Sequence, residues 1–320
     1  MSLVQSERGT YDDLHALVER FFSATFATDN PIITEAIKRM LAAGGKRLRP
    51  RITLLATDAC GGNAPEQLHL AAYMELIHVA TLVHDDVVDN AQTRRGVNAT
   101  AVDYGNRVSV LAGDYLFAWI FKNVTSGYPH PIPHVLSATL ADICDGEVLQ
   151  LQAMGSLDLP LETYVEIARK KTASLFAASA QCGAIVGGGS EREIEALREF
   201  GECFGVAFQM KDDLLDITAD ERSLGKPAAN DLTERKTTLP LIAALAAEDA
   251  DFRAEAARFY AADGNDGIPA IVRAIEQHGG LEATRAQIRS FAQRAKAALE
   301  PIRPGAAKKE LEKITDALAG

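Results

Sequence analysis

Helical spacing of apolar residues is the feature that most limits the folds open to this chain. Within residues 11–28, for example, Leu14, Leu17, Val18 and Phe21 recur every three or four positions, as they do on one face of a helix. No stretch alternates polar and apolar residues in the manner of a half-buried strand. The sequence therefore predicts an all-α fold. Further helices are expected over residues 31–44, 65–89, 106–124, 135–154, 161–186, 190–216, 239–248, 252–262, 268–277, 281–299 and 306–318.

Two of these helical segments end in acidic clusters of the form Asp-Asp-x-x-Asp. The first cluster consists of Asp85, Asp86 and Asp89, and the second of Asp212, Asp213 and Asp216. In each, the outer carboxylates are four residues apart and lie on one helix face. Carboxylates packed together repel one another unless a cation lies between them, and oxygen ligands suit Mg²⁺ shared with substrate phosphates better than Zn²⁺. One cluster is equally well explained by a solvated helix end, but two copies suggest two walls of one polyphosphate site.

Two cationic segments are suited to such an anion. Lys46, Arg47 and Arg49 follow a pair of glycines, where the backbone can approach a phosphate closely. Arg94 and Arg95 follow the first acidic cluster, and a guanidinium group binds phosphate oxygens through two parallel hydrogen bonds. For the first segment, a charged loop facing water is the simpler alternative.

Polar residues inside two apolar helices are further candidates. Lys170, Lys171 and Thr172 interrupt the helix expected at 161–186, although an unpaired buried lysine is costly. His78 shares the helix face of the first acidic cluster, two turns earlier, but a single histidine there is more often a hydrogen-bonded core residue. No role is assigned to the polar residues Asp142, Asp145, Glu147 and Gln150 of the helix expected at 135–154.

Composition narrows the class of protein. The formal net charge of −11 and the pI near 5.2 argue against nucleic acid as a partner, because such binding relies on basic surface. No Pro-, Gly- or Ser-rich linker divides the chain, so residues 1–320 are expected to form one domain. Four scattered cysteines predict buried free thiols of a cytosolic protein. No signal peptide and no run of about 18 apolar residues is seen, so a cytoplasmic protein without an integral membrane segment is expected.

The segments 76–89 and 208–216 resemble the two aspartate-rich motifs of the trans-isoprenyl diphosphate synthases, the polyprenyl synthetase family. The resemblance covers residues 44–241, including the sequence GGKRLRP at 44–50. It implies a bundle of long antiparallel helices around a central cavity, a homodimer, and about three Mg²⁺ ions per active site. The implied reaction joins isopentenyl diphosphate to an allylic diphosphate, such as farnesyl or geranyl diphosphate, after metal-assisted departure of pyrophosphate.

The resemblance also implies roles for individual residues. Metal ions would be bound by the six aspartates of the two clusters, of which Asp85, Asp89 and Asp212 would be catalytic together with Lys171. Isopentenyl diphosphate would be bound by Lys46, Arg49, His78 and Arg95. The allylic diphosphate would be bound by Arg94, Lys171, Thr172, Gln209, Lys226 and Lys236. Near the last two lysines, Ala229 and Arg235 replace glycines usual in the family, a difference that concerns the backbone path of this segment more than its chemistry.

Product length is expected to depend on Ala80 and Thr81, which stand where short-chain members carry a bulky aromatic residue. Because both are small, the growing chain would run on along the helices, where one turn of about 5.4 Å is comparable to one isoprene unit. The resemblance therefore implies a medium-to-long all-trans product of about six to ten units. Phe117, Trp119 and Phe121 are candidates for the residue that stops growth.

Three alternatives remain beside this interpretation. The first is a short-chain synthase that makes farnesyl or geranylgeranyl diphosphate. The second is a non-catalytic regulatory subunit of a heteromeric synthase, although such subunits have degraded aspartate motifs and both motifs are intact here. The third is a class I terpene cyclase, which would need neither the GGKRLRP segment nor a second complete acidic cluster.

Overall fold

The computed structural model describes residues 14–26, 28–42, 44–94, 96–218 and 229–320. Most of these residues are helical and very few lie in strands, which confirms the all-α prediction. The strands among them are β1 (Thr93–Arg94) and β2 (Val97–Asn98), a short antiparallel hairpin that the sequence analysis did not predict. None of the described helices is long and apolar enough to cross a membrane.

The chain forms two compact units. Unit 1 comprises Met1–Ser137, Ala178–Arg198 and Pro301–Leu311, and unit 2 comprises Ala138–Ala177, Glu199–Glu300 and Glu312–Gly320. Four helices contribute residues to both units: α7 (Ile132–Ala153), α9 (Ser174–Val186), α10 (Glu191–Thr218) and α17 (Ala306–Ala319).

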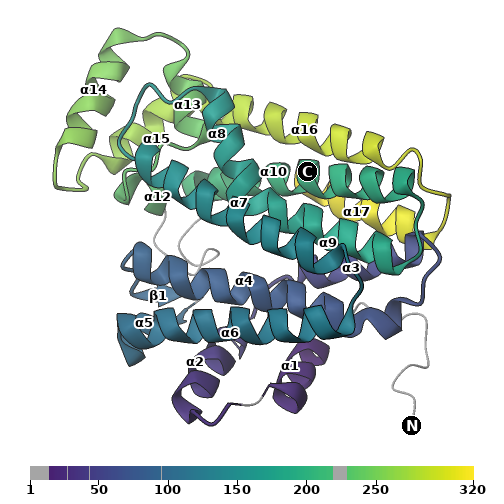
Figure 1. The fold of residues 1–320 in the computed structure, drawn as a ribbon. Helices are drawn as coiled ribbons and strands as arrows, with labels where there is room; N and C mark the ends of the chain where they lie inside the picture. The colour runs from purple at the N-terminus through teal and green to yellow at the C-terminus, as the bar shows by residue number, and fades with distance from the viewer. Residues whose placement is uncertain (1–13, 27, 43, 95, 219–228) are drawn as a thin grey trace. The chain divides into compact units, whose positions relative to one another are not determined.

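Unit 1 is built around two long helices that lie side by side, α4 (Leu68–Val88) and α6 (Asn106–Gly127) (Figure 1). They are antiparallel, because Tyr73 near the start of α4 stacks edge-on against Trp119 near the end of α6, whereas His84 near the end of α4 lies against Gly113 near the start of α6. Unit 1 also contains the hairpin of β1 and β2 and the shorter helices α1 (Leu14–Thr25), α2 (Pro31–Ala42), α3 (Leu48–Ala59), η1 (Ala64–Gln67) and α5 (Thr100–Tyr104).

Helix starts in unit 1 follow from local chemistry. The Asn30 side chain accepts a hydrogen bond from the Ile32 amide at 3.0 Å, and Pro31 begins α2, where its missing N–H is not needed. Helix α3 was not predicted, because it is buried on almost all sides and therefore has no single apolar stripe. Its polar residues Thr53 and Thr57 donate to the carbonyls one turn earlier in the same helix.

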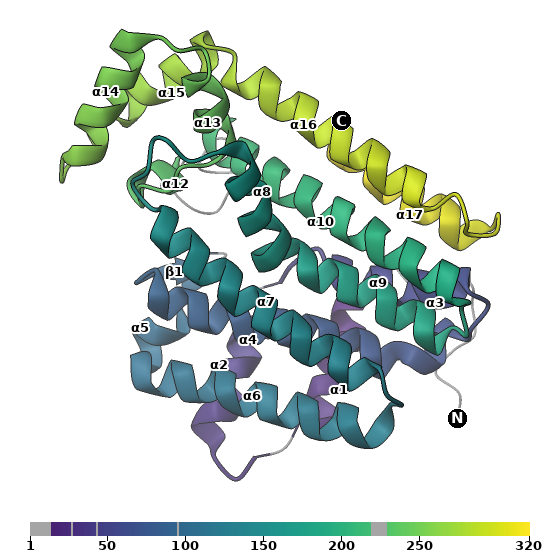
Figure 2. The same ribbon diagram turned by 45° about the horizontal axis from the view of Figure 1, so that its top comes forward.

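Unit 2 places its long helices close together through glycines. A Cβ at Gly205 of α10 would lie 2.5 Å from the Cα of Ala173, and a Cβ at Gly146 of α7 would lie 2.5 Å from the Lys171 amide nitrogen. The backbones can approach this closely only because side chains are missing there. As a result, the Lys170-Lys171-Thr172 segment lies between α7 and α10. Figure 2 shows α7 and α10 from a second direction.

The segment with Lys170 to Thr172 departs from the predicted continuous helix. The structure has α8 (Leu161–Ala168), then a π-helical turn, η2 (Arg169–Ala173), and then α9. Single π-turns within α-helices are rare and occur frequently at functional sites.

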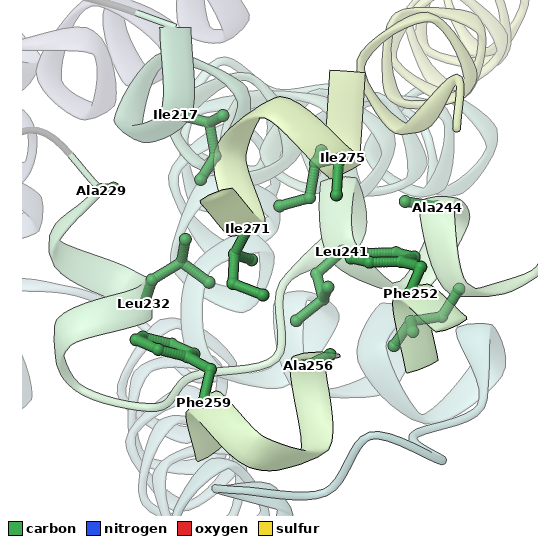
Figure 3. Close-up of a cluster of buried hydrophobic side chains, with 12 residues drawn as sticks. Ile217, Ala229, Leu232, Leu241, Ala244, Phe252, Ala256, Phe259, Ile271 and Ile275 are labelled. Carbon is green, nitrogen blue, oxygen red and sulfur yellow. The ribbon is translucent and has the colours of Figure 1, made fainter. Parts of the chain in front are cut away.

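The rest of unit 2 contains further helices, most of them short, with their own core. They are α12 (Asn230–Thr233), α13 (Leu239–Leu245), α14 (Ala250–Ala261), α15 (Ile268–Gln277) and α16 (Gly280–Ala298). Figure 3 shows their buried side chains meeting around Leu241 and Ile271, with Leu232 and Phe259 on one side and Phe252 on the other. This core holds residues 229–238, which follow the second acidic cluster.

The cysteine prediction was partly wrong. Cys182 and Cys203 are buried and Cys60 is half-buried, but Cys144 is exposed on α7. Burial raises the pKa of the Cys60 thiol to about 11, so this thiol is protonated and unreactive at neutral pH.

Candidate functional site

The first acidic cluster lies at the carboxyl end of α4. Asp85 and Asp86 belong to the last turn, and the Asp89 amide closes the helix by donating to the Asp85 carbonyl at 2.8 Å. Asp85 and Asp89 are half-buried. The carboxyl end of a helix carries partial negative charge, so carboxylates are disfavoured there unless a cation is nearby. The fold therefore keeps an unfavourable arrangement that a bound cation would relieve.

Asp86 differs from its two neighbours because it is completely buried. Its Oδ1 accepts hydrogen bonds from Arg94, at 2.7 Å from Nε and 2.5 Å from Nη2. Burial raises the pKa of Asp86, and Arg94 opposes part of that rise. Asp86 was predicted to bind metal and Arg94 to bind substrate, but in the structure each is the other's partner. Arg95 lies outside the described residues.

A second ion pair attaches the GGKRLRP segment to α4. Arg47 is buried, donates to Oε1 of Glu75 through Nη1, and donates to the Leu41 carbonyl at 2.7 Å through Nη2. Glu75 lies three residues before His78, on the same helix face. The sequence analysis counted Arg47 among the cations suited to an anion, although the resemblance implied no role for it. In the structure Arg47 fixes this segment, while Lys46 is exposed and Arg49 lies in the first turn of α3.

The second acidic cluster lies at the carboxyl end of α10 in unit 2. Asp212 is exposed, whereas Asp213 and Asp216 are buried. Asp213 accepts hydrogen bonds from the Tyr164 hydroxyl at 2.6 Å and from Gln209 Nε2 at 2.8 Å. Burial raises the pKa of Asp213 to about 6, although both hydrogen bonds act in the opposite direction. Gln209 was predicted from the sequence as a site residue, but Tyr164 was not.

A hydrogen-bond network joins this cluster to the π-turn. The Thr172 hydroxyl donates to Gln209 Oε1 at 2.6 Å, and Gln209 in turn donates to Asp213. The Gln209 amide thus has its oxygen toward Thr172 and its nitrogen toward the carboxylate, which can only accept when ionised. Four predicted residues of unit 2, Lys171, Thr172, Gln209 and Asp213, therefore gather on neighbouring turns of η2 and α10.

Lys171 is held by α7. Its Nζ donates to Gln150 Oε1 at 2.6 Å and forms an ion pair with Glu147. Neither partner had been assigned a role from the sequence, although their spacing of three residues places them on one helix face. Lys170 turns to a different partner and pairs with Asp145 at 3.2 Å.

Lys236 follows α12 and is held mainly through its backbone. Its amide donates to the Asp231 carbonyl at 2.8 Å, and its carbonyl accepts from the Tyr260 hydroxyl at 3.0 Å. Its side chain is 13% exposed and pairs with Glu234 at 2.6 Å. Lys226 lies outside the described residues.

The positions expected to control product length lie on α4. Ala80 is buried, and Thr81 is half-buried with its hydroxyl donating to the His78 carbonyl at 2.8 Å. Of the aromatic residues on α6, Phe117 contacts His84, with 5.7 Å between ring centroids. Trp119 instead packs against Tyr73 of α4, at 5.9 Å.

The carboxylates fit a metal that is shared with substrate. Within the described part of the chain, no three His, Cys, Asp or Glu side chains gather closely enough to hold a metal ion by themselves. Asp85 and Asp89 offer two sets of hard oxygens, and Mg²⁺ typically binds to one or two carboxylates together with waters and substrate phosphates. The donor set therefore suits Mg²⁺ brought in with a diphosphate.

Comparisons with known proteins point the same way. The polyprenyl synthetase family matches residues 30–276. The short chain isoprenyl diphosphate synthase of Methanothermobacter thermautotrophicus is 36% identical over 288 residues, which are 89% of each chain. The octaprenyl diphosphate synthase of Escherichia coli is 38% identical over 277 residues, 86% of this chain and 85% of the relative.

Two solved structures extend these similarities to the fold. A decaprenyl diphosphate synthase from Rhodobacter capsulatus has a TM-score of 0.89 and 37% identity, covering 96% of this chain and 95% of that one. A polyprenyl synthase from Caulobacter crescentus CB15, complexed with calcium and isoprenyl diphosphate, has a TM-score of 0.90 and 36% identity, covering 96% and 94%. These similarities confirm the fold class expected from the sequence.

Proposed function

Because this chain belongs to the polyprenyl synthetase family, we propose that it is a Mg²⁺-dependent prenyltransferase that joins isopentenyl diphosphate to an allylic diphosphate. The product is an all-trans polyprenyl diphosphate. The observation that carries the proposal is the hydrogen-bonded chain from Thr172 through Gln209 to Asp213, which joins the π-turn that also carries Lys171 to the second acidic cluster. The two compact units are taken to form one polyprenyl synthetase domain over residues 1–320.

The metal ions are assigned to the two acidic clusters. Asp85 and Asp89 would hold two Mg²⁺ ions and the Asp212 cluster a third, about three in all. Bound Mg²⁺ would neutralise the negative charge that develops on the diphosphate as its C–O bond breaks. Buried Asp86 supports this site by binding Arg94, and buried Asp213 supports it by orienting Gln209.

The allylic diphosphate is assigned to the cations of unit 2, together with Arg94. Lys171 and Lys236 supply positive charge, with Lys226 as a further candidate. Thr172 is suited to a different role, because its hydroxyl hydrogen is already donated to Gln209. It therefore presents lone pairs, which favour a nearby positive charge rather than a phosphate oxygen.

Isopentenyl diphosphate is assigned to Lys46, Arg49, His78 and Arg95. Support comes from the Arg47–Glu75 pair, which attaches the segment with Lys46 and Arg49 to α4 one turn before His78. The double bond of isopentenyl diphosphate attacks the allylic carbon, and loss of a proton restores an alkene. Departing pyrophosphate is the proposed proton acceptor.

A medium-to-long product is proposed over a short one. The small residues Ala80 and Thr81 support this choice, because neither fills space beside α4. The similarity to the short chain isoprenyl diphosphate synthase of Methanothermobacter thermautotrophicus favours the second candidate, a short-chain synthase. The similarity to octaprenyl and decaprenyl diphosphate synthases favours the first.

A homodimer is also proposed. Three large apolar side chains of α5 and α6 are exposed in the single chain: Val102 at 45%, Val110 at 39% and Leu111 at 61%. Covering them with a second copy would remove apolar surface from water, at about 25 cal/mol per Å². Sedimentation at micromolar concentration tests this, and a monomer would contradict it.

One assay separates the candidate activities. The purified chain is incubated with Mg²⁺ and farnesyl diphosphate, first alone and then with isopentenyl diphosphate, and released pyrophosphate and product length are measured. Pyrophosphate release only when both substrates are present supports the synthase. Release from farnesyl diphosphate alone indicates a cyclase, and no release under either condition indicates a non-catalytic subunit.

A further inference from the structure

Two residues of the segment 229–238, which carries Lys236, have an unusual backbone conformation. Ala229 has φ of 54° and Arg235 has φ of 58°, in the left-handed region that favours glycine. A residue with a side chain costs roughly 1 kcal/mol more than glycine there. A side chain at such a position is expected to make contacts that offset this cost, and the Arg235 side chain makes several.

The Arg235 guanidinium is bound by five acceptors and one aromatic ring. Nη1 donates to the Leu232 carbonyl at 2.8 Å, to the Thr233 carbonyl at 3.3 Å and to Asn265 Oδ1 at 3.1 Å, and Nη2 donates to the carbonyls of Ala262 and Gly264, both at 2.9 Å. Cζ lies 4.2 Å from the centre of the Phe259 ring. Because both terminal nitrogens are engaged, this arginine is not available to a substrate phosphate. It joins α12 to the turn between α14 and α15 instead.

The backbone on both sides of Arg235 is fixed as well. The Arg235 carbonyl accepts from the Gly155 amide at 3.0 Å, and the next carbonyl, that of Lys236, accepts from Tyr260. At the other end of the segment, Asp216 accepts from the Ala229 amide at 2.7 Å through its carbonyl and from the Asp231 amide at 3.0 Å through Oδ2. The segment is thus held between the second acidic cluster and the Arg235 contacts.

We propose that Arg235 is a positioning residue for the reaction, whose contacts with the α14–α15 turn hold Lys236 where its ammonium group can meet the allylic diphosphate. The role of Lys236 in this proposal rests on the proposed function. The mechanical part of the proposal, that Arg235 holds the segment in place, rests on the contacts alone. Without the guanidinium, residues 229–238 lose their hydrogen bonds to the turn between α14 and α15, and Lys236 samples more conformations. Ordering Lys236 when the substrate binds then costs free energy and weakens binding.

Hydrogen–deuterium exchange of the substrate-free protein tests the mechanical part. Arg235→Gly accommodates the left-handed backbone but lacks the contacts, and Arg235→Lys keeps a positive charge without the guanidinium fork. Both are expected to increase exchange of the Lys236 amide and its neighbours. Glu248→Gly is the matched control, because Glu248 is exposed and has φ of 56° outside the segment. Exchange equal to wild type in both Arg235 variants would overturn the proposal.

Kinetics with a second substitution test the functional part. Arg235→Gly is expected to lower kcat/KM for farnesyl diphosphate about tenfold, mostly through KM, because a misplaced binding group weakens ground-state contacts. In a Lys236→Ala background the same change should have little further effect. An equal loss in both backgrounds would overturn the positioning role. If wild type lacked prenyl transfer altogether, the proposed function would fail, while the exchange experiment would still decide whether Arg235 holds the segment.

Discussion

Arg94 binds Asp86 through two nitrogen contacts to a single carboxylate oxygen, 2.5 and 2.7 Å long. This relationship divides the first acidic cluster into two kinds of carboxylate. Asp85 and Asp89 are half-buried, whereas Asp86 is completely buried and tied to the β1 strand. The three residues have the same side chain, but their surroundings differ.

The first prediction is that Asp86→Ala and Asp85→Ala have different consequences. Asp86→Ala removes the buried partner of Arg94 and is expected to lower the free energy of unfolding by about 1–3 kcal/mol. Asp85→Ala should leave stability within about 0.5 kcal/mol but abolish prenyl transfer. Urea denaturation and a turnover assay on both variants check this. Equal stability losses would mean that the burial of Asp86 does not distinguish it from Asp85.

The second prediction concerns metal removal. Chelation of Mg²⁺ is expected to abolish turnover without changing the melting temperature of the substrate-free chain, because no three ligand side chains gather within the described residues. Mg²⁺ should raise the melting temperature only when a diphosphate is present, since ligands that bind the folded state stabilise it. Thermal denaturation with Mg²⁺ or chelator, each with and without pyrophosphate, makes the comparison. A lower melting temperature in chelator alone would reveal a resident structural ion.

The third prediction concerns the partners of Lys171. Gln150→Leu removes the hydrogen bond to Lys171 at 2.6 Å while keeping side-chain volume. A charge-assisted hydrogen bond contributes about 1.5 kcal/mol or more, so kcat/KM for the allylic diphosphate is expected to fall about tenfold. Gln152→Leu, on the exposed face of α7, is the matched control and should behave as wild type. A normal kcat/KM for Gln150→Leu would show that Glu147 positions Lys171 without help.

Much of this arrangement was predictable because amphipathic helices show their spacing in sequence. The ends of α4 and α10 and their six aspartates followed from that spacing. The burial of Arg47 beside exposed Lys46 did not follow from it, because Arg47 is paired with Glu75, which is 28 residues away in sequence. Helix α3 was missed because burial on nearly every side leaves no stripe, and η2 was missed because its π-turn depends on the close approach of α7 and α10.

The backbone conformation at Ala229 and Arg235 also depends on residues that are distant in sequence. Glycines are usual at these two positions in the family, and the sequence analysis expected their replacement to concern the backbone path of residues 229–238. Both adopt the left-handed conformation that suits glycine, and the Arg235 side chain makes contacts that offset the strain. Those contacts come from the α14–α15 turn, which is 27 to 30 residues further along the chain, so local sequence could not reveal them.

The fourth prediction concerns the buried pair of Arg47 and Glu75. Both side chains are only 3% exposed, and removing one member of such a pair leaves an uncompensated buried charge, which costs about 3–5 kcal/mol. Glu75→Ala is therefore expected to lower the free energy of unfolding by that amount. Arg51→Ala is the control, because its pair with Glu310 is partly exposed and should contribute about 1 kcal/mol or less. Similar losses in the two variants would contradict the structural role of Arg47.

The last prediction is that Ala80→Phe shortens the product. Ala80 is buried and lies between Tyr73 and His84 at spacings of seven and four residues, which place all three on one side of α4. That side faces α6, since Tyr73 packs on Trp119 and His84 lies against Gly113. A product that grows along this side from the first acidic cluster passes Ala80 before it reaches the pair of Tyr73 and Trp119.

A phenylalanine at position 80 would therefore stop growth about seven residues, or roughly 10 Å of helix, before that aromatic pair. The substitution adds volume at a buried position and is expected to cost about 1–3 kcal/mol of stability, so its melting temperature must be measured beside its products. Thr81→Phe is the companion variant, because Thr81 is half-buried and donates only to its own helix. The products made from isopentenyl and farnesyl diphosphates are separated by chain length. Wild type should give medium or long chains and the folded Ala80→Phe variant shorter ones; unchanged products from both variants, or a wild type that stops at farnesyl diphosphate, would refute this account of chain length.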